Sequence, residues 1–331
     1  MLQYLSMNIY VITRKIIQDV VLIIFVVVIL YVVFRIMPGS PVDLFLHGLK
    51  HPTEQEKITI EKQLGLYGGK FSLTNFLIYL RDMFTFNFGE DYYTGQSVIF
   101  VIKQALPYTL LLFGSAAVIS FAIGIPLGIY TSFKRGKKSE SGIITASTLL
   151  NSIPFFVFAI IFFVYLAGDL HIFPLRSIFP ISYIVHPTLK SIELILYYLA
   201  MPIIVLVIVE AAGHLLTMRA AMVSVLGEDF ITTARAKGVS ERGIMFHHAA
   251  RNAMIPVSTR MALEFAFLMS GAVIVEVIFS IHGMGTVLYD ATLQEDYPVS
   301  EGALFVISII VILAYSAIDF IHAWLDPRIK V

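Results

Sequence analysis

Four carboxylates interrupt stretches of this chain that are otherwise apolar, namely Glu210, Glu264, Glu276 and Asp319. A carboxylate inside a membrane-spanning segment is costly to bury, so it usually pairs with another group, faces a water-filled cavity or binds an ion. The four acids are therefore candidates for an ion site or a solute pathway. Glu210 and Glu264 could instead reach a water interface. Glu276 and Asp319 lie within about two turns of the ends of apolar runs, where pairing or simple solvation is an equal alternative.

The sequence carries no pattern typical of an enzyme. It contains no H-E-x-x-H or G-x-S-x-G motif, and it has no cysteine, which excludes disulfides, thiolate metal sites and cysteine nucleophiles. The adjacent His247 and His248 would point apart on a helix, which favours solvated or lipid-facing side chains over a membrane-embedded hydrolase. There is also no G-x-x-x-x-G-K-[ST] loop, so we expect no catalytic residue, no metal site and no bound ATP in this chain.

One hydrophilic stretch stands out, "DFITTARAKGVSERGIMFHHAARNAMIP", residues 229–256. Asp229 is a good N-cap for a short helix. The exposed side chains of that helix would be small, coming from Thr232, Thr233, Ala234 and Ala236. Such a surface suits insertion into a groove on a cytosolic partner. An amphipathic linker resting on anionic lipid is the alternative.

Three residues predict how this stretch is divided. Gly238 suits the position just past a helix end, where the backbone turns left-handed. Ser240 is placed to cap a second helix, and Pro256 would close the unit before the next apolar run.

The composition is that of an integral membrane protein. Of the 331 residues, 58% are hydrophobic and 14% are charged, whereas soluble domains carry roughly a quarter charged residues. The 23 basic and 23 acidic side chains cancel, so no overall field favours a nucleic acid partner.

A helix needs about 20 apolar residues to cross a bilayer. The first apolar run is longer than the core of a signal peptide and lacks a small-x-small cleavage site, so we interpret it as a retained helix. We predict an all-α membrane protein, a bundle of about six transmembrane helices at Ile16–Met37, Leu106–Phe133, Ile143–Ala167, Leu194–Leu216, Met261–Ile281 and Gly302–Trp324.

The basic residues predict the orientation. Four lie in "KRGKK", residues 134–138, and six lie in the loop 217–260, so both loops should be cytoplasmic by the positive-inside rule. The loop before the last span has no Lys or Arg but has four acids, and it should face outside; they are Asp290, Glu295, Asp296 and Glu301. Both termini are then cytoplasmic.

The long outer loop, residues 38–101, carries helix signals of its own. "TEQE" at Thr53–Glu56 is a capping box. "NFLIYLRDMF" places its apolar residues at helical spacing, which predicts an amphipathic helix that lies on the outer membrane surface or, as we favour, packs against the bundle.

Proline and glycine mark the spans themselves. Pro126, Pro154 and Pro202 each remove a backbone hydrogen bond, and Gly124 and Gly128 have the G-x-x-x-G spacing of closely packed helices. Both features are also ordinary in membrane helices.

The stretch "EDFITTARAKGVSERGIMFHHAARNAMIPV" resembles the cytoplasmic loop of permease subunits in the oligopeptide/dipeptide class of ABC importers. The resemblance covers nearly the whole chain, through "RIMPGSP", "NFGEDYYTGQSV", "IPLGIYTSFKRG", "NSIPFF", "GAVIVEVIFSIHGMGTVLYDAT", "DYP" and "LDPRIK". It implies an N-terminal helix with a long outer loop in residues 1–102. A five-helix transport domain would follow in residues 103–331, with its coupling loop at 217–260.

By this resemblance, residues 229–238 correspond to the coupling helix and the turn after it, which dock on an ATPase. Thr232, Thr233 and Ala234 stand where the general pattern has Glu-Ala-Ala, and the later Ile-x-Leu-Pro element is absent. The residues implied in coupling are Asp229, Thr232, Thr233, Ala234, Arg235, Ala236, Lys237 and Gly238.

The resemblance further implies a multi-pass protein of the plasma membrane that forms half of a pathway for di- or oligopeptides. Its partners would be a second homologous permease, two cytosolic ATPases that hold ATP and Mg, and an extracytoplasmic solute-binding protein. Oligosaccharides or nickel are alternative solutes within the same class. A self-contained ion-coupled transporter is a more distant alternative, and no inverted internal repeat supports it.

Overall fold

The computed structural model describes residues 9–37 and 71–325, with the side chains of 9–11, 262–272 and 318–325 left undescribed. The capping box at Thr53–Glu56 and the side chains of Glu264 and Asp319 therefore lie outside the described part. Within the described ranges the chain is helical apart from loops and one isolated bridge between Glu90 and Ser97, which confirms the all-α prediction.

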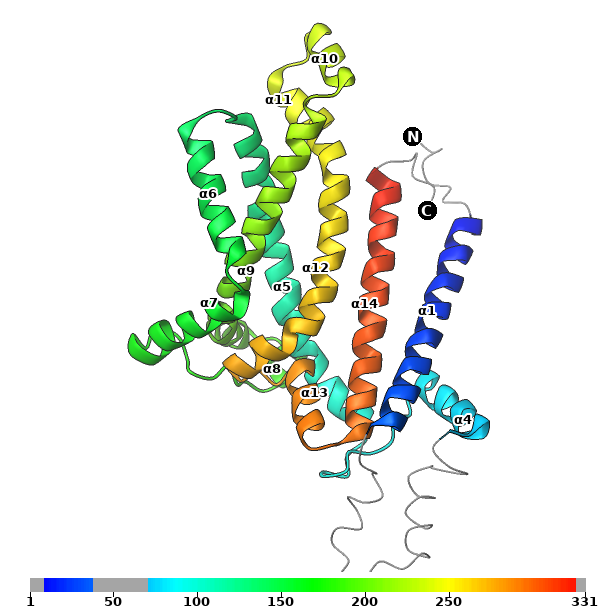
Figure 1. The fold of residues 1–331 in the computed structure, drawn as a ribbon. Helices are drawn as coiled ribbons and strands as arrows, with labels where there is room; N and C mark the ends of the chain where they lie inside the picture. Colours follow the sequence, from blue (N-terminus) through cyan, green and yellow to red (C-terminus); the bar gives the residue numbers. More distant parts are fainter. Residues whose placement is uncertain (1–8, 38–70, 326–331) are drawn as a thin grey trace, which may run out of the picture. The chain divides into compact units, whose positions relative to one another are not determined.

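In the part of the chain that the structure describes, four helices are long and apolar enough to cross a membrane (Figure 1). They lie in α1 (Ile9–Ile36), α5 (Val98–Phe133), α9 (Leu189–Val225) and α14 (Tyr297–Leu325). Helices α1, α5 and α14 end at the predicted residue or next to it. All four helices begin before their predicted apolar runs, and α9 also ends after its run.

Two further candidates are bent. The first joins α6 (Lys138–Ser152) to α7 (Phe155–Phe162) and the π-helical η2 (Phe163–Asp169), with a bend of 89°. The second joins the end of α12 (Ala250–Phe279) to α13 (Met284–Leu293), with a bend of 91°. Counting each pair as one span gives six, the predicted number.

Proline contributes to only part of this bending. Pro154 lies at the break between α6 and α7, whereas Pro126 and Pro202 remain inside the continuous helices α5 and α9. Pro256 was expected to close the cytoplasmic unit, and that expectation is wrong, because Pro256 lies inside α12.

The loop predicted to be cytoplasmic is shorter than residues 217–260, because both flanking helices continue beyond their apolar runs. α9 extends to Val225 and α12 begins at Ala250. An apolar run ends where the lipid ends, but a helix need not: the 37 residues of α9 measure about 55 Å, against about 30 Å of hydrocarbon.

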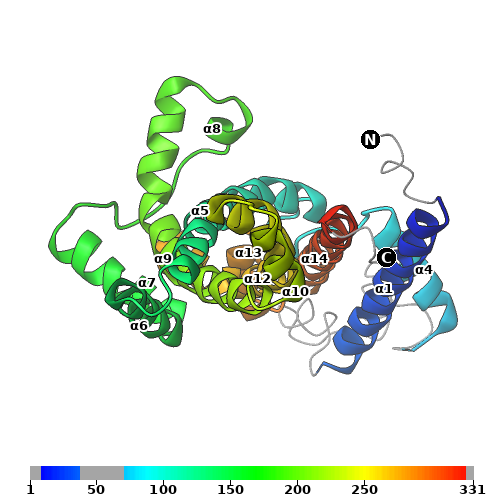
Figure 2. The same cartoon turned by 90° about the horizontal axis from the view of Figure 1, so that it is seen from above.

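The chain divides into two compact units. The first comprises Met1–Lys15, Leu106–Thr286 and Leu313–Val331, and the second comprises Ile16–Ala105 and Val287–Ile312. In the first unit α9 is the central helix, and α6, α7 and α12 pack against it (Figures 1 and 2).

Helix α5 also lies very close to α9, at the two glycines of the G-x-x-x-G spacing. A methyl group on Gly124 would lie 2.7 Å from the carbonyl oxygen of Ala211. A methyl group on Gly128 would lie 2.6 Å from Met218 Cβ and 2.8 Å from the Leu215 carbonyl oxygen. The absence of a side chain is what permits this approach.

In the second unit, aromatic side chains gather around Phe305 of α14. The rings of Phe84, Phe86 and Phe88 lie within 6.4 Å of it, centroid to centroid. Glu301 was expected in a solvated loop, but it is buried in α14 at 9% exposure, because that helix already begins at Tyr297.

We predict that Gly128→Ala will destabilise the protein by about 1–3 kcal/mol, since the added methyl group must displace backbone as well as side-chain atoms. Gly114→Ala is the matched control, because it is the same change in the same helix with no atom within 4 Å. The midpoints of thermal unfolding in detergent test this, and equal midpoints for the two variants would contradict it.

Candidate coupling loop and buried carboxylates

The connection between α9 and α12 is built on a short helix, α10 (Asp229–Ala236), which lies past the ends of both (Figure 1). Its inner face is fixed by burial: Ile231 is fully buried and Ala234 is 7% exposed. These two side chains join a core that also contains Ile129, Met218, Met222, Ile244, Met245, Ala249, Ala250, Ala253 and Val257. α10 therefore packs directly against the ends of the neighbouring helices.

The end of α10 is a Schellman motif, as the sequence predicted from Gly238. The N–H of Gly238 donates to the carbonyl of Arg235 at 2.9 Å, and the N–H of Val239 donates to the carbonyl of Ala234 at 3.2 Å. Gly238 has φ of 77°, the left-handed conformation that glycine adopts without steric penalty. A side chain at this position would meet open space, so only the backbone conformation demands glycine.

The other end differs from the prediction by one residue. The N-cap is Glu228, whose backbone is extended and whose side chain makes no capping bond. Asp229 instead occupies the first turn, where its carboxylate complements the positive end of the helix dipole.

The outer face of α10 carries most of the residues expected to dock on a partner. Ala234 was predicted on this surface, and that prediction is wrong, because it packs inward on the same side as Ile231. Phe230 is 42% exposed and was missed, although it directly precedes the predicted small face. The exposed residues are Asp229, Phe230, Thr232, Thr233, Arg235, Ala236, Lys237 and Gly238.

A second short helix follows, α11 (Glu241–Gly243), which continues into the π-helical η3 (Ile244–Ala249). Ser240 caps it as predicted, with its Oγ accepting from the N–H of Gly243 at 3.3 Å. The Nε of Arg235 donates to Oε1 of Glu241 at 2.9 Å, which ties α10 to α11. Both side chains are about half exposed, so this ion pair contributes little stability.

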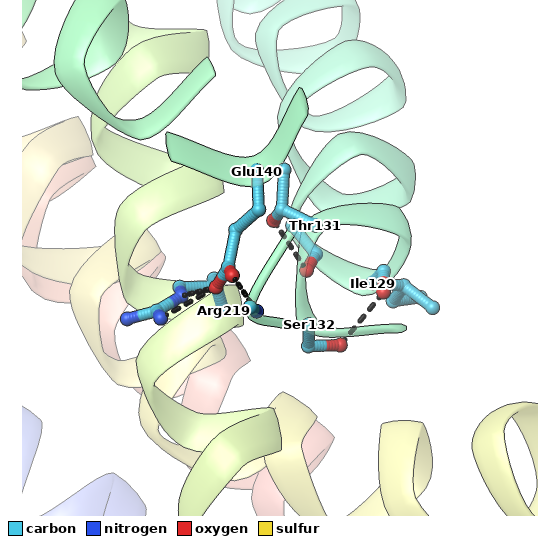
Figure 3. Close-up of polar contacts among 7 residues, drawn as sticks. Ile129, Thr131, Ser132, Glu140 and Arg219 are labelled. Atoms are coloured by element: carbon cyan, nitrogen blue, oxygen red, sulfur yellow. Dashed lines mark hydrogen bonds and ion pairs between the residues drawn. The ribbon is translucent and has the colours of Figure 1, made fainter. Parts of the chain in front are cut away.

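A more protected ion pair fixes the neighbouring turn between α5 and α6 (Figure 3). Arg219, on α9, donates through Nη2 to Oε1 of Glu140 at 2.6 Å, and the Glu140 side chain is 7% exposed. The other carboxylate oxygen accepts from the N–H of Gly136 at 2.6 Å. The Glu140 side chain thus joins the start of α6, the turn before it and the C-terminal half of α9.

Glu276 is completely buried at the bend between α12 and α13. It accepts hydrogen bonds from the Thr109 hydroxyl at 2.6 Å and from the N–H of Thr286 at 3.0 Å. Thr109 in turn accepts from the N–H of Met284 at 2.7 Å. The acid satisfies the otherwise unpaired N–H groups that open α13, and a methyl group on Gly283 would overlap it.

Glu210 is half-buried on α9, 3.5 Å from the hydroxyl of Ser120 on α5. Another polar contact in this region was not foreseen: Nη1 of Arg260 donates to the Thr217 hydroxyl at 2.9 Å, joining α12 to α9. Of the four carboxylates in the sequence prediction, the two whose side chains are described, Glu210 and Glu276, contact different residues. Among the residues that the structure describes, no three His, Asp or Glu side chains could share a metal ion.

On the face predicted to be outside, Asp296 caps α14 and holds the 88–97 segment. Its Oδ1 accepts from the N–H of Val299 at 3.2 Å and its Oδ2 from the N–H of Tyr92 at 3.0 Å, and it is 2% exposed. Burial raises the pKa of Asp296 to about 6, and the neighbouring Asp91 adds to the rise. Burial acts in the same direction on Asp91, but N–H bonds from Thr94 and Tyr93 outweigh it and lower the pKa of that carboxyl.

Residues 124–331 match the family described as binding-protein-dependent transport system inner membrane component. This match covers the end of α5 and every later element from α6 to α14, including the loop that carries α10. The chain belongs to this family of inner membrane transport components.

Curated relatives of this transport component extend the match over almost the whole chain. It is 31% identical over 313 residues to the di/tripeptide transport system permease protein DppB of Pseudomonas aeruginosa, covering 91% of this chain and 92% of that protein. It is 30% identical over 320 residues to the oligopeptide transport system permease protein AppB of Bacillus subtilis, covering 96% and 98%. A probable peptide ABC transporter permease of Sinorhizobium fredii, y4tP, is 28% identical over 98% of this chain and its own full length.

These findings confirm the resemblance drawn from the sequence. The transport component is a multi-pass protein of the plasma membrane, as its family and its apolar helices both indicate. The orientation of its termini and the role of each coupling-loop residue stay predictions.

We predict that Glu140 and Arg219 stabilise each other more than Arg235 and Glu241 do, since a protected carboxylate is screened less by water. Glu140→Gln, Arg219→Gln and the double variant give the coupling of the first pair, and the equivalent variants of the second pair are the control. Unfolding free energies in detergent measure both, and equal coupling energies would contradict the prediction.

We also predict that the 88–97 segment loosens as pH rises through about 6. The pKa of Asp296 is higher in the folded protein than the ordinary value of 3.8, so its protonation stabilises the fold at low pH, and that stabilisation is lost as the pH rises through 6. Hydrogen exchange, corrected for intrinsic rates, should show falling protection of these amides. Asp296→Asn should remove the dependence, and its persistence in that variant would refute the assignment to Asp296.

Proposed function

We propose that this chain is one of two membrane subunits of an ATP-driven peptide importer, and that α10 couples it to a cytosolic ATPase. The observation that carries the proposal is the division of α10 into two faces. Ile231 and Ala234 are buried against the ends of the membrane helices, whereas Thr232, Thr233 and Ala236 leave a small-residue surface free. A partner that holds the outer face would therefore move the membrane helices with it.

The energy for transport would come from that partner. The sequence has no phosphate-binding loop, so ATP and Mg would be held by two ATPase subunits. Closure of the ATPases would carry α10 along with α9 and α12, and the membrane helices would change between outward-open and inward-open packings largely as rigid bodies. A second homologous permease would complete the pathway, and an extracytoplasmic binding protein would deliver the solute.

Peptides are the solute we favour. The names of the relatives from Pseudomonas aeruginosa and Bacillus subtilis refer to di/tripeptide and oligopeptide transport, and both align over more than nine-tenths of this chain. Oligosaccharides and nickel are the alternatives in the same class. An ion-coupled transporter is less well supported, because Glu276 is engaged in capping α13 and is not open to a pathway.

The residues on α10 would divide the work. Phe230, Thr232 and Thr233 would enter a groove on the ATPase, with Asp229, Ala236, Lys237 and Gly238 at its margins. Ala234 would not contact the ATPase, and its small side chain would let α10 pack closely on the buried core. Arg235 is bound to Glu241, so it would hold the shape of the turn.

We predict that Gly238→Val will uncouple the transporter. The β-branched side chain adds about 1–2 kcal/mol of strain to a left-handed residue, and tilting α10 would relieve it. The complex should then lose uptake while it either fails to assemble or hydrolyses ATP unproductively. Uptake and ATPase rate are measured on the same reconstituted complex.

Three variants make this test specific. Gly238→Asn should retain most uptake, because asparagine tolerates the left-handed region. The other two variants are controls that should retain uptake. Val239→Ile changes the size of a side chain that does not need positive φ. Gly136→Val places the same backbone strain in another open turn, at φ of 83°. Uptake at the wild-type rate in Gly238→Val would show that the turn is a passive linker, and the coupling role of α10 would be abandoned.

A further inference from the structure

The short helix α4 (Leu73–Phe84) presents three sides of different chemistry. Asn75, Tyr79 and Met83 form the buried side, at 2%, 8% and 3% exposure. Thr74, Arg81 and Asp82 lie on a mainly polar side by the 100° step of a helix, with the partly buried Ile78 among them. The arrangement differs from an ordinary amphipathic helix, which has one apolar side and one polar side.

The third side is apolar and mostly exposed, although Leu80 is partly buried and the Phe84 ring lies 6.4 Å from that of Phe305, centroid to centroid. Leu73, Leu77, Leu80 and Phe84 recur at intervals of four, three and four residues, so they lie within about 60° of one another around the helix. Leu73 is 75% exposed, Leu77 is 55% exposed and Phe84 is 42% exposed. We call these four residues the apolar stripe of α4.

Contacts with α1 fix the depth of this stripe in the membrane. The Tyr31 hydroxyl donates to the carbonyl of Ser72, just before α4, at 3.3 Å. The Tyr31 ring lies 5.2 Å from the ring of Phe76 and 5.4 Å from that of Tyr79, centroid to centroid. Tyr31 itself is about 7 Å inside the end of α1 at Ile36, at 1.5 Å per residue.

Helix α4 therefore begins at the depth of the bilayer interface and not above it. Interfacial helices bury their apolar face about 5–10 Å into the boundary between headgroups and acyl chains, which is the depth that Tyr31 sets. Val32, Val33 and Ile36, between Tyr31 and the end of α1, are exposed apolar side chains, and the exposed Phe25 and Ile29 lie deeper. Tyr31 and Tyr79 are themselves buried in the contact between α1 and α4, which fixes α4 at this level of α1.

We propose that α4 is an interfacial helix whose apolar stripe is inserted between the phospholipids of the leaflet at the C-terminal end of α1. The charge distribution makes this the outer leaflet. The stripe faces acyl chains, the Asn75 side faces protein, and the side with Arg81 faces water and headgroups. Lipid thus holds α4 at the membrane surface. This inference does not depend on which solute is transported.

Site-directed spin labelling tests the proposal, and the natural absence of cysteine leaves no background in this chain. The full chain is labelled at a single cysteine, assembled with its partner subunits and reconstituted in liposomes of phosphatidylethanolamine and phosphatidylglycerol. Collision rates with oxygen, which concentrates in lipid, are compared with those of a nickel chelate, which stays in water. Leu77→Cys probes the stripe and Thr74→Cys the polar side of the same helix, and Val33→Cys on α1 is the membrane reference.

The label at Leu77 should collide with oxygen several-fold more than with the nickel chelate, as at Val33, and the ratio should reverse at Thr74. A label at Leu77 that favours the nickel chelate would place the stripe in water and overturn the proposal. A label there that is closed to both reagents would also overturn it, because protein would then cover the stripe. Leu73→Cys repeats the measurement one turn away, so a local distortion at one site cannot decide the outcome.

Discussion

Ile231 lies with none of its surface exposed where α10 meets the ends of the membrane helices, and the position of the loop between α9 and α12 depends on that burial. A short helix of eight residues is too short to be stable alone in water. Packing of Ile231 and Ala234 supplies the stability that the isolated helix lacks, and it also fixes the direction of the outer face. The Schellman turn at Gly238 then stops the helix at a defined residue. Stability and orientation of the loop come from the same contact.

Several polar side chains of the first unit each bond to a residue of another helix. Glu276 accepts from Thr109 and from the opening turn of α13, Arg260 donates to Thr217, and Glu140 binds Arg219 near the membrane surface. Apart from the bond between Glu276 and α13, which directly follows α12, each contact connects elements distant in sequence. Because lipid offers no competing hydrogen bonds, such pairs position helices that hydrophobic packing alone would leave free to slide.

The sequence predicted the features that depend on local chemistry. Apolar runs located the spans, and the backbone freedom of glycine located the turn at Gly238. Helix ends were less well placed, because α9 and α12 continue into water, where hydropathy no longer marks them. Ala234 and Glu301 were assigned to the wrong environments for a related reason: burial there is decided by neighbours from other helices. The pair of Glu140 and Arg219 spans 79 positions, a separation at which no local pattern operates.

The contact of Gly124 and Gly128 with α9 has a consequence for how the first unit can deform. At these glycines no side chain of α5 separates the two helices, so moving α5 away from α9 would leave an empty space that His214 and Met218 could fill only in part. The contact therefore resists separation of α5 from α9. A rearrangement within the first unit would cost less free energy at interfaces formed by longer side chains, which can change rotamer.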